Sequence, residues 1–119
     1  MKVMVIVKAS KDSEAGKLPS AQFMEDMVAY NEKLIAAGIM TDGAGLKPTS
    51  EGARVAFSGA ERTHVKGPFG NVEDLVAGYW IWKVKDLDEA IDWVKRCPNP
   101  MPGPSAIEIR PLYEVEDFA

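Results

Sequence analysis

The chain has 119 residues, the length of one domain, and 46% of them are hydrophobic while 27% are charged. This composition is typical of a globular protein and argues against disorder. Fourteen basic and eighteen acidic residues give a net charge of −4 without any basic block, which argues against nucleic-acid binding. The longest unbroken apolar run, Val3–Val7, is far shorter than the roughly 20 residues of a membrane-spanning helix, so we expect no membrane association.

One cysteine, Cys97, and one histidine, His64, limit the chemistry of a single chain. A lone cysteine cannot form an internal disulfide, and the first residues lack the features of a signal peptide, so we expect a cytoplasmic protein. Structural zinc requires four Cys or His ligands. The glycine motifs of phosphate and dinucleotide binding and the serine motif of hydrolases are also missing. We therefore expect neither a metal nor an organic cofactor.

The first half of the chain predicts a strand, a loop, a helix and a second strand. The β-branched run Val3–Val7 is typical of a buried strand, and the polar Ser10–Gly16 is typical of a loop. Ser20 is the expected N-cap of a helix with apolar residues at helical spacing, and Gly38 is the expected terminator. Ile39–Asp42 predicts a second short strand.

The second half predicts a hairpin, a strand, a helix and a last strand. Two strand-like segments flank the turn residues Ser58–Glu61, and Gly67 and Pro68 then interrupt the chain. Asp86 is the expected N-cap of the second helix, because an acidic residue stands three positions later. The four elements are expected over residues 54–65, 79–84, 86–97 and 107–110.

This order of elements predicts a ferredoxin-like α+β fold for a single domain over residues 1–119, with an antiparallel sheet and two helices on one face. The other face of the sheet is then uncovered. Trp80 and Trp82 share one side of their strand and are too large and apolar to stay in water. We therefore predict a homodimer that resembles a dimeric α+β barrel, in which the sheet faces bearing Trp80 and Trp82 meet.

Five short motifs follow one another in the chain at characteristic spacing. They are Gly45-Leu46-x-Pro48, Gly67-Pro68-Phe69, Gly78-Tyr79-Trp80, Asp86–Ala90 with Trp93, Arg96 and Pro98, and Glu108–Pro111. Through these motifs the whole chain resembles the YCII-related, or DGPF-domain, family of small bacterial proteins. The resemblance implies a ferredoxin-like, usually dimeric subunit of largely unassigned function. It also implies that some relatives are cofactor-free enzymes acting on small ring compounds.

The chain departs from the family pattern at its polar positions. Lys66 stands where the family has an acid before Gly-Pro-Phe, Ala44 replaces an acid, and Glu73 replaces a lysine. The histidine of a sister branch, proposed there as half of a His–Asp site, is absent from the helix over 21–37. Because the charges at positions 66 and 73 are exchanged together, we hypothesise that Lys66 and Glu73 form an ion pair of reversed polarity.

The candidate catalytic residues are His64 and Asp42. An imidazole beside basic neighbours suits general acid–base chemistry, and Asp42 is its expected carboxylate partner across the sheet. The alternatives are a solvated histidine on a polar strand face and an aspartate that bonds its own backbone in a turn.

The candidate substrate-binding residues lie at two places. Arg110 is suited to bind a carboxylate through two hydrogen bonds, or else to pair with Glu108 on the same strand. The corner formed by Gly67, Pro68 and Phe69 is suited to border a pocket, or else to act as a structural turn, and Lys66 precedes it. We expect a small-molecule pocket between the helix over 21–37, the loop Gly43–Gly52 and this corner.

Two functions remain open from the sequence. One is a homodimeric small-molecule-binding protein with a cofactor-free isomerase-like or lyase-like activity, for which His64 would carry the proton chemistry. The other is a non-catalytic ligand-binding or regulatory module, which the missing polar signature positions favour. An inward-facing His64 would favour the first function, and a pocket without a titratable pair would favour the second.

Overall fold

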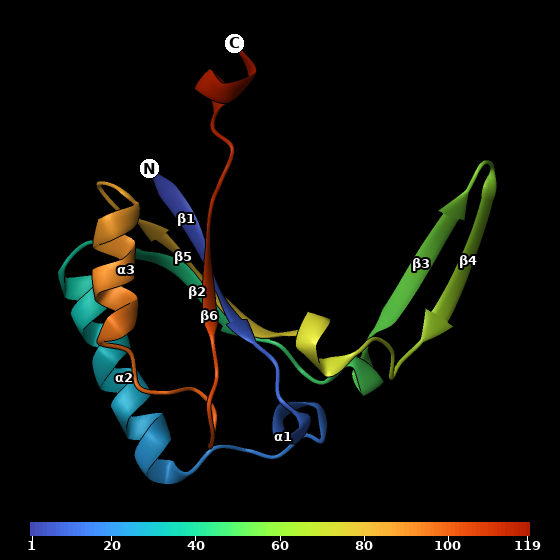
Figure 1. Cartoon of the computed structure of the whole chain (residues 1–119), viewed down its shortest axis with the longest axis horizontal. Helices are drawn as coiled ribbons and strands as arrows, with labels where there is room; N and C mark the ends of the chain where they lie inside the picture. Colours follow the sequence, from blue (N-terminus) through green and yellow to red (C-terminus); the bar gives the residue numbers. More distant parts are fainter.

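A four-stranded antiparallel sheet with two helices on one face forms the body of the protein (Figure 1). The computed structural model describes all residues 1–119. The sheet has the order β2-β5-β1-β6, which is the strand order of a ferredoxin-like fold. The strands of this sheet are β1 (Lys2–Lys8), β2 (Met40–Gly45), β5 (Val76–Lys83) and β6 (Ile107–Pro111), and the covering helices are α2 (Ala21–Ala36) and α3 (Leu87–Lys95). The predicted fold class is confirmed.

Local signals in the sequence start and stop the helices. The Ser20 hydroxyl accepts a hydrogen bond from the backbone N–H of Phe23 at 3.1 Å, which satisfies one unpaired donor of the first turn of α2. Gly38 follows α2 with a φ of 73°, a conformation that glycine adopts without steric cost. The Asp86 carboxylate accepts from the N–H of Glu89 at 2.9 Å at the start of α3. All three predicted helix ends are confirmed.

The region Ser10–Gly16, expected as a loop, contains the short helix α1 (Lys11–Glu14). The Ser10 hydroxyl accepts from the N–H of Ser13 at 3.1 Å, and the Ser13 hydroxyl accepts from the N–H of Ser10 at 2.9 Å. This reciprocal capping box stabilises a single turn that is too short to show apolar periodicity. Three 3₁₀ turns complete the structure: η1 (Thr49–Glu51), η2 (Val72–Asp74) and η3 (Val115–Phe118).

The core lies between the sheet and the helices, and both tryptophans belong to it. Val3 is paired with Trp82 and Val5 with Trp80, so all four side chains point to the same side of the sheet, where Leu34 of α2 is also fully buried. The prediction that Trp80 and Trp82 lie on the helix-free face was therefore wrong. Apolar residues occupy both sides of β1 and β5, so the sequence pattern alone does not show which side the helices cover.

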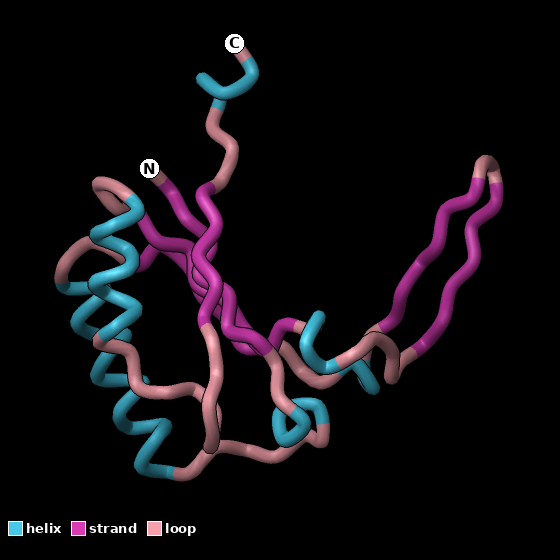
Figure 2. The backbone as a smooth tube through the Cα atoms, in the orientation of Figure 1, coloured by secondary structure: helices cyan, strands magenta, loops and turns pink.

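The predicted hairpin forms, but it leaves the body of the protein. β3 (Ala53–Ser58) pairs only with β4 (Glu61–Lys66), in a separate two-stranded sheet. This hairpin, residues 53–66, projects away from the four-stranded sheet on the side without helices (Figures 1 and 2). We call it the arm. None of the helices in the structure has the length and apolar character needed to cross a bilayer.

Candidate functional site

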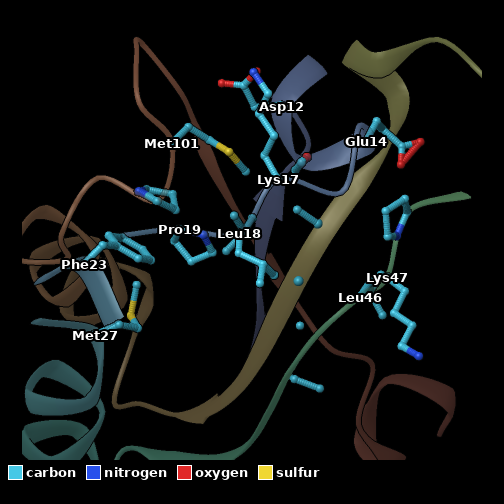
Figure 3. Close-up of a pocket in the computed structure, with 18 of the residues that line it drawn as sticks. Asp12, Glu14, Lys17, Leu18, Pro19, Phe23, Met27, Leu46, Lys47 and Met101 are labelled. Carbon is cyan, nitrogen blue, oxygen red and sulfur yellow. The ribbon is translucent and has the colours of Figure 1, made fainter. Parts of the chain in front are cut away.

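A cleft of about 1110 Å³ opens between α2, the segment around α1, and the end of the sheet where β1 finishes and β5 begins. Its volume lies slightly above the range of about 300–1,000 Å³ that is typical of small-molecule sites. Four stretches far apart in the sequence line it (Figure 3). They are the segment 12–20 with the α2 residues Phe23, Met27 and Asn31, the β2 region with its following loop, residues 77–80 of β5, and the loop 99–102.

One wall of the cleft is rich in aromatic and sulfur-containing side chains. Phe23 and Met27 come from α2, one turn apart, and Met101 comes from the loop after α3. In Figure 3 these side chains gather around Pro19 and Leu18. Leu18 is 91% exposed, so this apolar side chain has no cover within the subunit. Methionine sulfur makes favourable contacts with aromatic rings, so the wall is suited to a flat ring compound.

The amide side chain of Asn31, from α2, lies in the cleft beside the core residue Trp80. The Trp80 indole N–H donates to Oδ1 of Asn31 at 2.9 Å, and both residues line the cleft. This bond orients the Asn31 amide and leaves its NH₂ group without a protein acceptor. The half-buried amide is therefore a donor that is available to a ligand oxygen.

Glycine makes room beside Trp80. A Cβ on Gly43 would lie 2.8 Å from the Trp80 side chain, so the cleft wall at this point requires the absence of a side chain.

The carboxylate of Glu14 stabilises the rim of the cleft. Its two oxygens accept from the hydroxyl of Thr49 at 2.7 Å and from the Thr49 backbone N–H at 2.9 Å. The Thr49 hydroxyl in turn accepts from the N–H of Phe69 at 3.3 Å. Glu14 thus connects α1 to the corner after the arm, and Figure 3 shows it turned away from the apolar wall. We assign it a structural role.

The two candidate catalytic residues are not brought together in one subunit. His64 is exposed in β4 of the arm, and Asp42 is exposed in β2 of the main sheet. Neither residue lines the cleft. Oδ1 of Asp42 accepts from the N–H of Gly43 at 2.8 Å, which is the own-backbone bond considered as its alternative role, although it forms within a strand. One subunit alone does not form the predicted catalytic His64–Asp42 pair, so this pair stays a prediction.

The candidate binding residues also lie outside the cleft. Glu108 and Arg110 form an exposed ion pair of 3.3 Å on β6, as the alternative interpretation expected. Lys66 is exposed at the end of the arm and forms no ion pair with Glu73, which lies in η2, so the hypothesis of a reversed pair was wrong. The exchange of charges relative to the family pattern indicates that the two charges are compatible, but it does not show that the loop between them brings them together.

The corner after the arm is a structural element. A Cβ on Gly67 would overlap the Thr49 carbonyl oxygen, so only glycine fits there. The half-buried Phe69 ring packs under the guanidinium of Arg54, with 4.3 Å between the guanidinium carbon and the ring centre. These residues and the exposed Pro68 anchor the arm to the body. Their contacts are those of a structural turn, the alternative role that the sequence offered for this corner.

Two ionisable groups have pKa values raised by burial. The Tyr30 hydroxyl donates to the carbonyl of Trp93 at 2.6 Å, and desolvation raises its pKa above the ordinary range of a phenol. Desolvation also raises the pKa of the Cys97 thiol from 9.0 to about 11. Neither residue lines the cleft, and no group of three His, Cys, Asp or Glu side chains is placed to hold a metal ion.

Sequence reasoning identified Phe23 and Met27 only as parts of an apolar helix stripe, and it missed Asn31. The stripe contributes Tyr30 and Leu34 to the core, while its N-terminal turn extends beyond the sheet and lines the cleft. Asn31 follows Tyr30 on the same helix, and its signal is faint: a neutral amide beside the apolar stripe, where charged residues otherwise prevail.

Comparisons with known proteins agree with this architecture. The chain is 30% identical over 103 residues to the uncharacterized protein R00369 of Rhizobium meliloti (strain 1021), covering 87% of this chain and 83% of that protein. The fold of the present chain is similar to that of 5-chloro-2-hydroxyhydroquinone dehydrochlorinase (TftG) from Burkholderia phenoliruptrix AC1100, which was solved in complex with 2,5-dihydroxybenzoquinone. The TM-score is 0.55 over 98% of each chain, at 15% identity. The family model of the YCII-related domain matches residues 1–116, and the chain therefore belongs to the YCII-related family.

Proposed function

We propose that the protein binds a small, flat and largely apolar organic molecule in the cleft beside α2. The observation that carries this proposal is the lining: Phe23, Met27 and Met101 form an apolar wall, and Asn31 presents a free amide N–H at its back. A ring compound with an oxygen substituent matches both features, since the ring packs on the wall and the oxygen accepts from Asn31. The quinone bound to the dehydrochlorinase of similar fold shares the flat ring and the oxygen substituents, although it is more polar than the wall alone requires.

Binding is measurable through the tryptophan that lines the cleft. We expect 2,5-dihydroxybenzoquinone or a related hydroxylated ring compound to quench Trp80 fluorescence in a saturable manner. The same compound raises the unfolding temperature, because a ligand that binds only the folded chain stabilises it. Phe23→Ala is expected to weaken binding about tenfold, since an aromatic contact contributes roughly 0.5–1.5 kcal/mol.

Met24→Ala is the matched control, because Met24 lies next to Phe23 on α2 but is 52% exposed and outside the cleft. This variant is expected to bind like the wild-type chain. Equal affinities of the Phe23 and Met24 variants, or no saturable binding across a panel of ring compounds, would contradict the proposal.

A cofactor-free acid–base enzyme is the second candidate. It is supported by the dehydrochlorinase activity named for the protein of similar fold. The cleft of one subunit contains no histidine, and the half-buried Asp12 that borders it is paired with Lys17 at 3.3 Å. The binding proposal therefore predicts that the ring compound is recovered unchanged. Release of chloride from 5-chloro-2-hydroxyhydroquinone by the wild-type chain, and its loss in His64→Ala, would instead establish the enzyme.

A further inference from the structure

The loop between α3 and β6, residues 98–105, forms one side of the cleft but has no backbone support of its own. Four of its eight residues are prolines, which have no N–H to donate. None of the eight takes part in a backbone–backbone hydrogen bond. The thiol of Cys97 donates to the carbonyl of Pro98, but this bond reaches only the first residue of the loop. The shape of the loop therefore depends on its own side chains.

The side chain of Asn99 supplies the missing support. Its Oδ1 accepts from the N–H of Met101 at 3.1 Å and from the hydroxyl of Ser105 at 2.6 Å, and its Nδ2 donates to the carbonyl of Gly103 at 3.0 Å. These partners lie two, six and four positions further along the chain, so one amide group spans the loop. An amide is suited to this place because it offers an acceptor and donors together.

The bond to Met101 matters for the cleft, because Met101 carries the loop's longest apolar side chain into it. Met101 is half-buried, whereas residues 102–106 are exposed. Figure 3 shows the Met101 side chain reaching from the loop toward Leu18. A hydrogen bond from the N–H two positions on to an asparagine side chain closes a turn of the backbone. Asn99 therefore fixes the point from which the thioether enters the cleft.

A thioether held in this way gives the cleft a preference between kinds of ring. Sulfur makes a favourable contact with an aromatic ring at a distance of about 5 Å, often at the ring edge, and a saturated ring of the same size offers no such contact. Methionine has three rotatable bonds of its own, so a backbone that also moved would spread the sulfur over many positions. The contact thus requires an ordered loop.

We propose that Met101 makes the cleft selective for aromatic over saturated rings, and that Asn99 is the positioning residue on which this selectivity depends. The inference rests on the function proposed above and narrows its ligand to an aromatic compound. Asn99 also borders the cleft, but its amide is engaged within the loop, so it acts through Met101.

Calorimetric titration of the full chain with two probes tests the selectivity. 2-Naphthol is flat and aromatic, and decahydro-2-naphthol has the same carbon skeleton and hydroxyl group in saturated rings. The measured quantity is the ratio of their two dissociation constants, which does not change when a variant is merely less stable. Met101→Leu keeps the volume and apolar character of the side chain but removes the sulfur. It is expected to reduce the preference for 2-naphthol roughly twofold to tenfold.

Variants of Asn99 test its positioning role. Asn99→Ala is expected to reduce the preference as much as Met101→Leu does, although Met101 is still present. Asn99→Asp keeps the acceptor for Met101 and Ser105 and loses only the donor to Gly103, so its ratio is expected to lie closer to the wild-type value. Asn71→Ala is the matched control, because Asn71 is exposed, lies outside the cleft and makes no capping hydrogen bond through its side chain.

The outcomes separate this inference from the binding proposal. An unchanged ratio in Met101→Leu would overturn the selectivity, and an Asn99→Ala ratio equal to that of Asn71→Ala would overturn the positioning role. In both cases 2-naphthol still binds and the binding proposal stands. Failure of both probes to bind the wild-type chain would also overturn the inference, and the panel of ring compounds then decides whether the binding proposal fails with it.

Discussion

At the scale of single residues, burial controls the reactivity of the one thiol. Cys97 is half-buried after α3, and its Sγ–H donates to the carbonyl of Pro98 at 3.2 Å. The buried position lacks the positive end of a helix dipole that would stabilise a thiolate, so desolvation raises the pKa from 9.0 to about 11. Folding therefore favours the neutral thiol, and this contribution to stability is complete below pH 9 and is lost as the pH rises through 11.

This shift predicts a pH profile for alkylation. The rate of modification of Cys97 by iodoacetamide in the folded chain is expected to keep rising until about pH 11, whereas the rate in the urea-unfolded chain levels off near pH 9. Mass spectrometry at timed intervals measures both rates. A plateau near pH 9 in the folded chain would show that burial does not protect the thiol.

The roles of residues that start or end a helix could be predicted from the sequence, because these residues act on the backbone of near neighbours. Ser20, Gly38 and Asp86 do what their positions indicate, because a helix cap depends on only three or four neighbouring residues. His64 and Asp42 could not be placed in this way. Their relationship depends on where the hairpin lies relative to the sheet, and no local pattern contains that information.

At the scale of elements, one glycine determines how the arm joins the body. Gly67 lies against the Thr49 carbonyl, and Thr49 is itself bound at two points by Glu14. Gly67→Ala is expected to lower the free energy of unfolding by about 1–3 kcal/mol, because the added methyl group must displace a tightly bound backbone segment. Urea denaturation followed by tryptophan fluorescence measures the change.

Gly45→Ala is the control for this substitution, because a Cβ on Gly45 meets no atom within 4 Å and Gly45 has no positive φ. Its effect on stability is expected to be small. If the two variants unfold at the same urea concentration, Thr49 yields freely and the corner is not a rigid attachment for the arm.

Apart from the short helix α1, the strands and helices could be predicted to within a few residues, while the side of the sheet that the helices cover could not. The alternation in β5 separates Trp80 from Tyr79, and β1 separates Val5 from Ile6, but both sets are apolar. Only the packing of Leu34 against one set decides the question. That contact joins residues far apart in the chain, so it is invisible to any window of sequence.

At the scale of the whole molecule, the cleft and the helix-free face of the main sheet have the same origin. Both arise where segments from distant parts of the chain come together, as Met101 does with Phe23 and as Asp42 does with Ile81. Their residue types are ordinary, and only the assembled fold makes them a site. The sequence places a pocket between the helix over 21–37, the loop 43–52 and the corner at Gly67–Phe69; α2 and that loop line the cleft, whereas the corner lies outside it.

The helix-free face of the main sheet, where Met4, Ile6, Tyr79 and Ile81 form a half-buried apolar patch, leads to a prediction about the stability of the predicted homodimer. If two copies fold as one unit, the unfolding temperature of the wild-type chain rises with protein concentration, because association stabilises only the folded subunits. Ile81→Glu places a charge in this patch and is expected to weaken the dimer about 100-fold or more, since an unpaired buried charge costs roughly 3–5 kcal/mol. The concentration dependence then disappears. Lys83→Glu, on the same side of β5 but outside the apolar patch, is expected to retain it. Calorimetry across a hundredfold range of concentration distinguishes the two variants, and an Ile81 variant that keeps the wild-type dependence would place the partner on another surface.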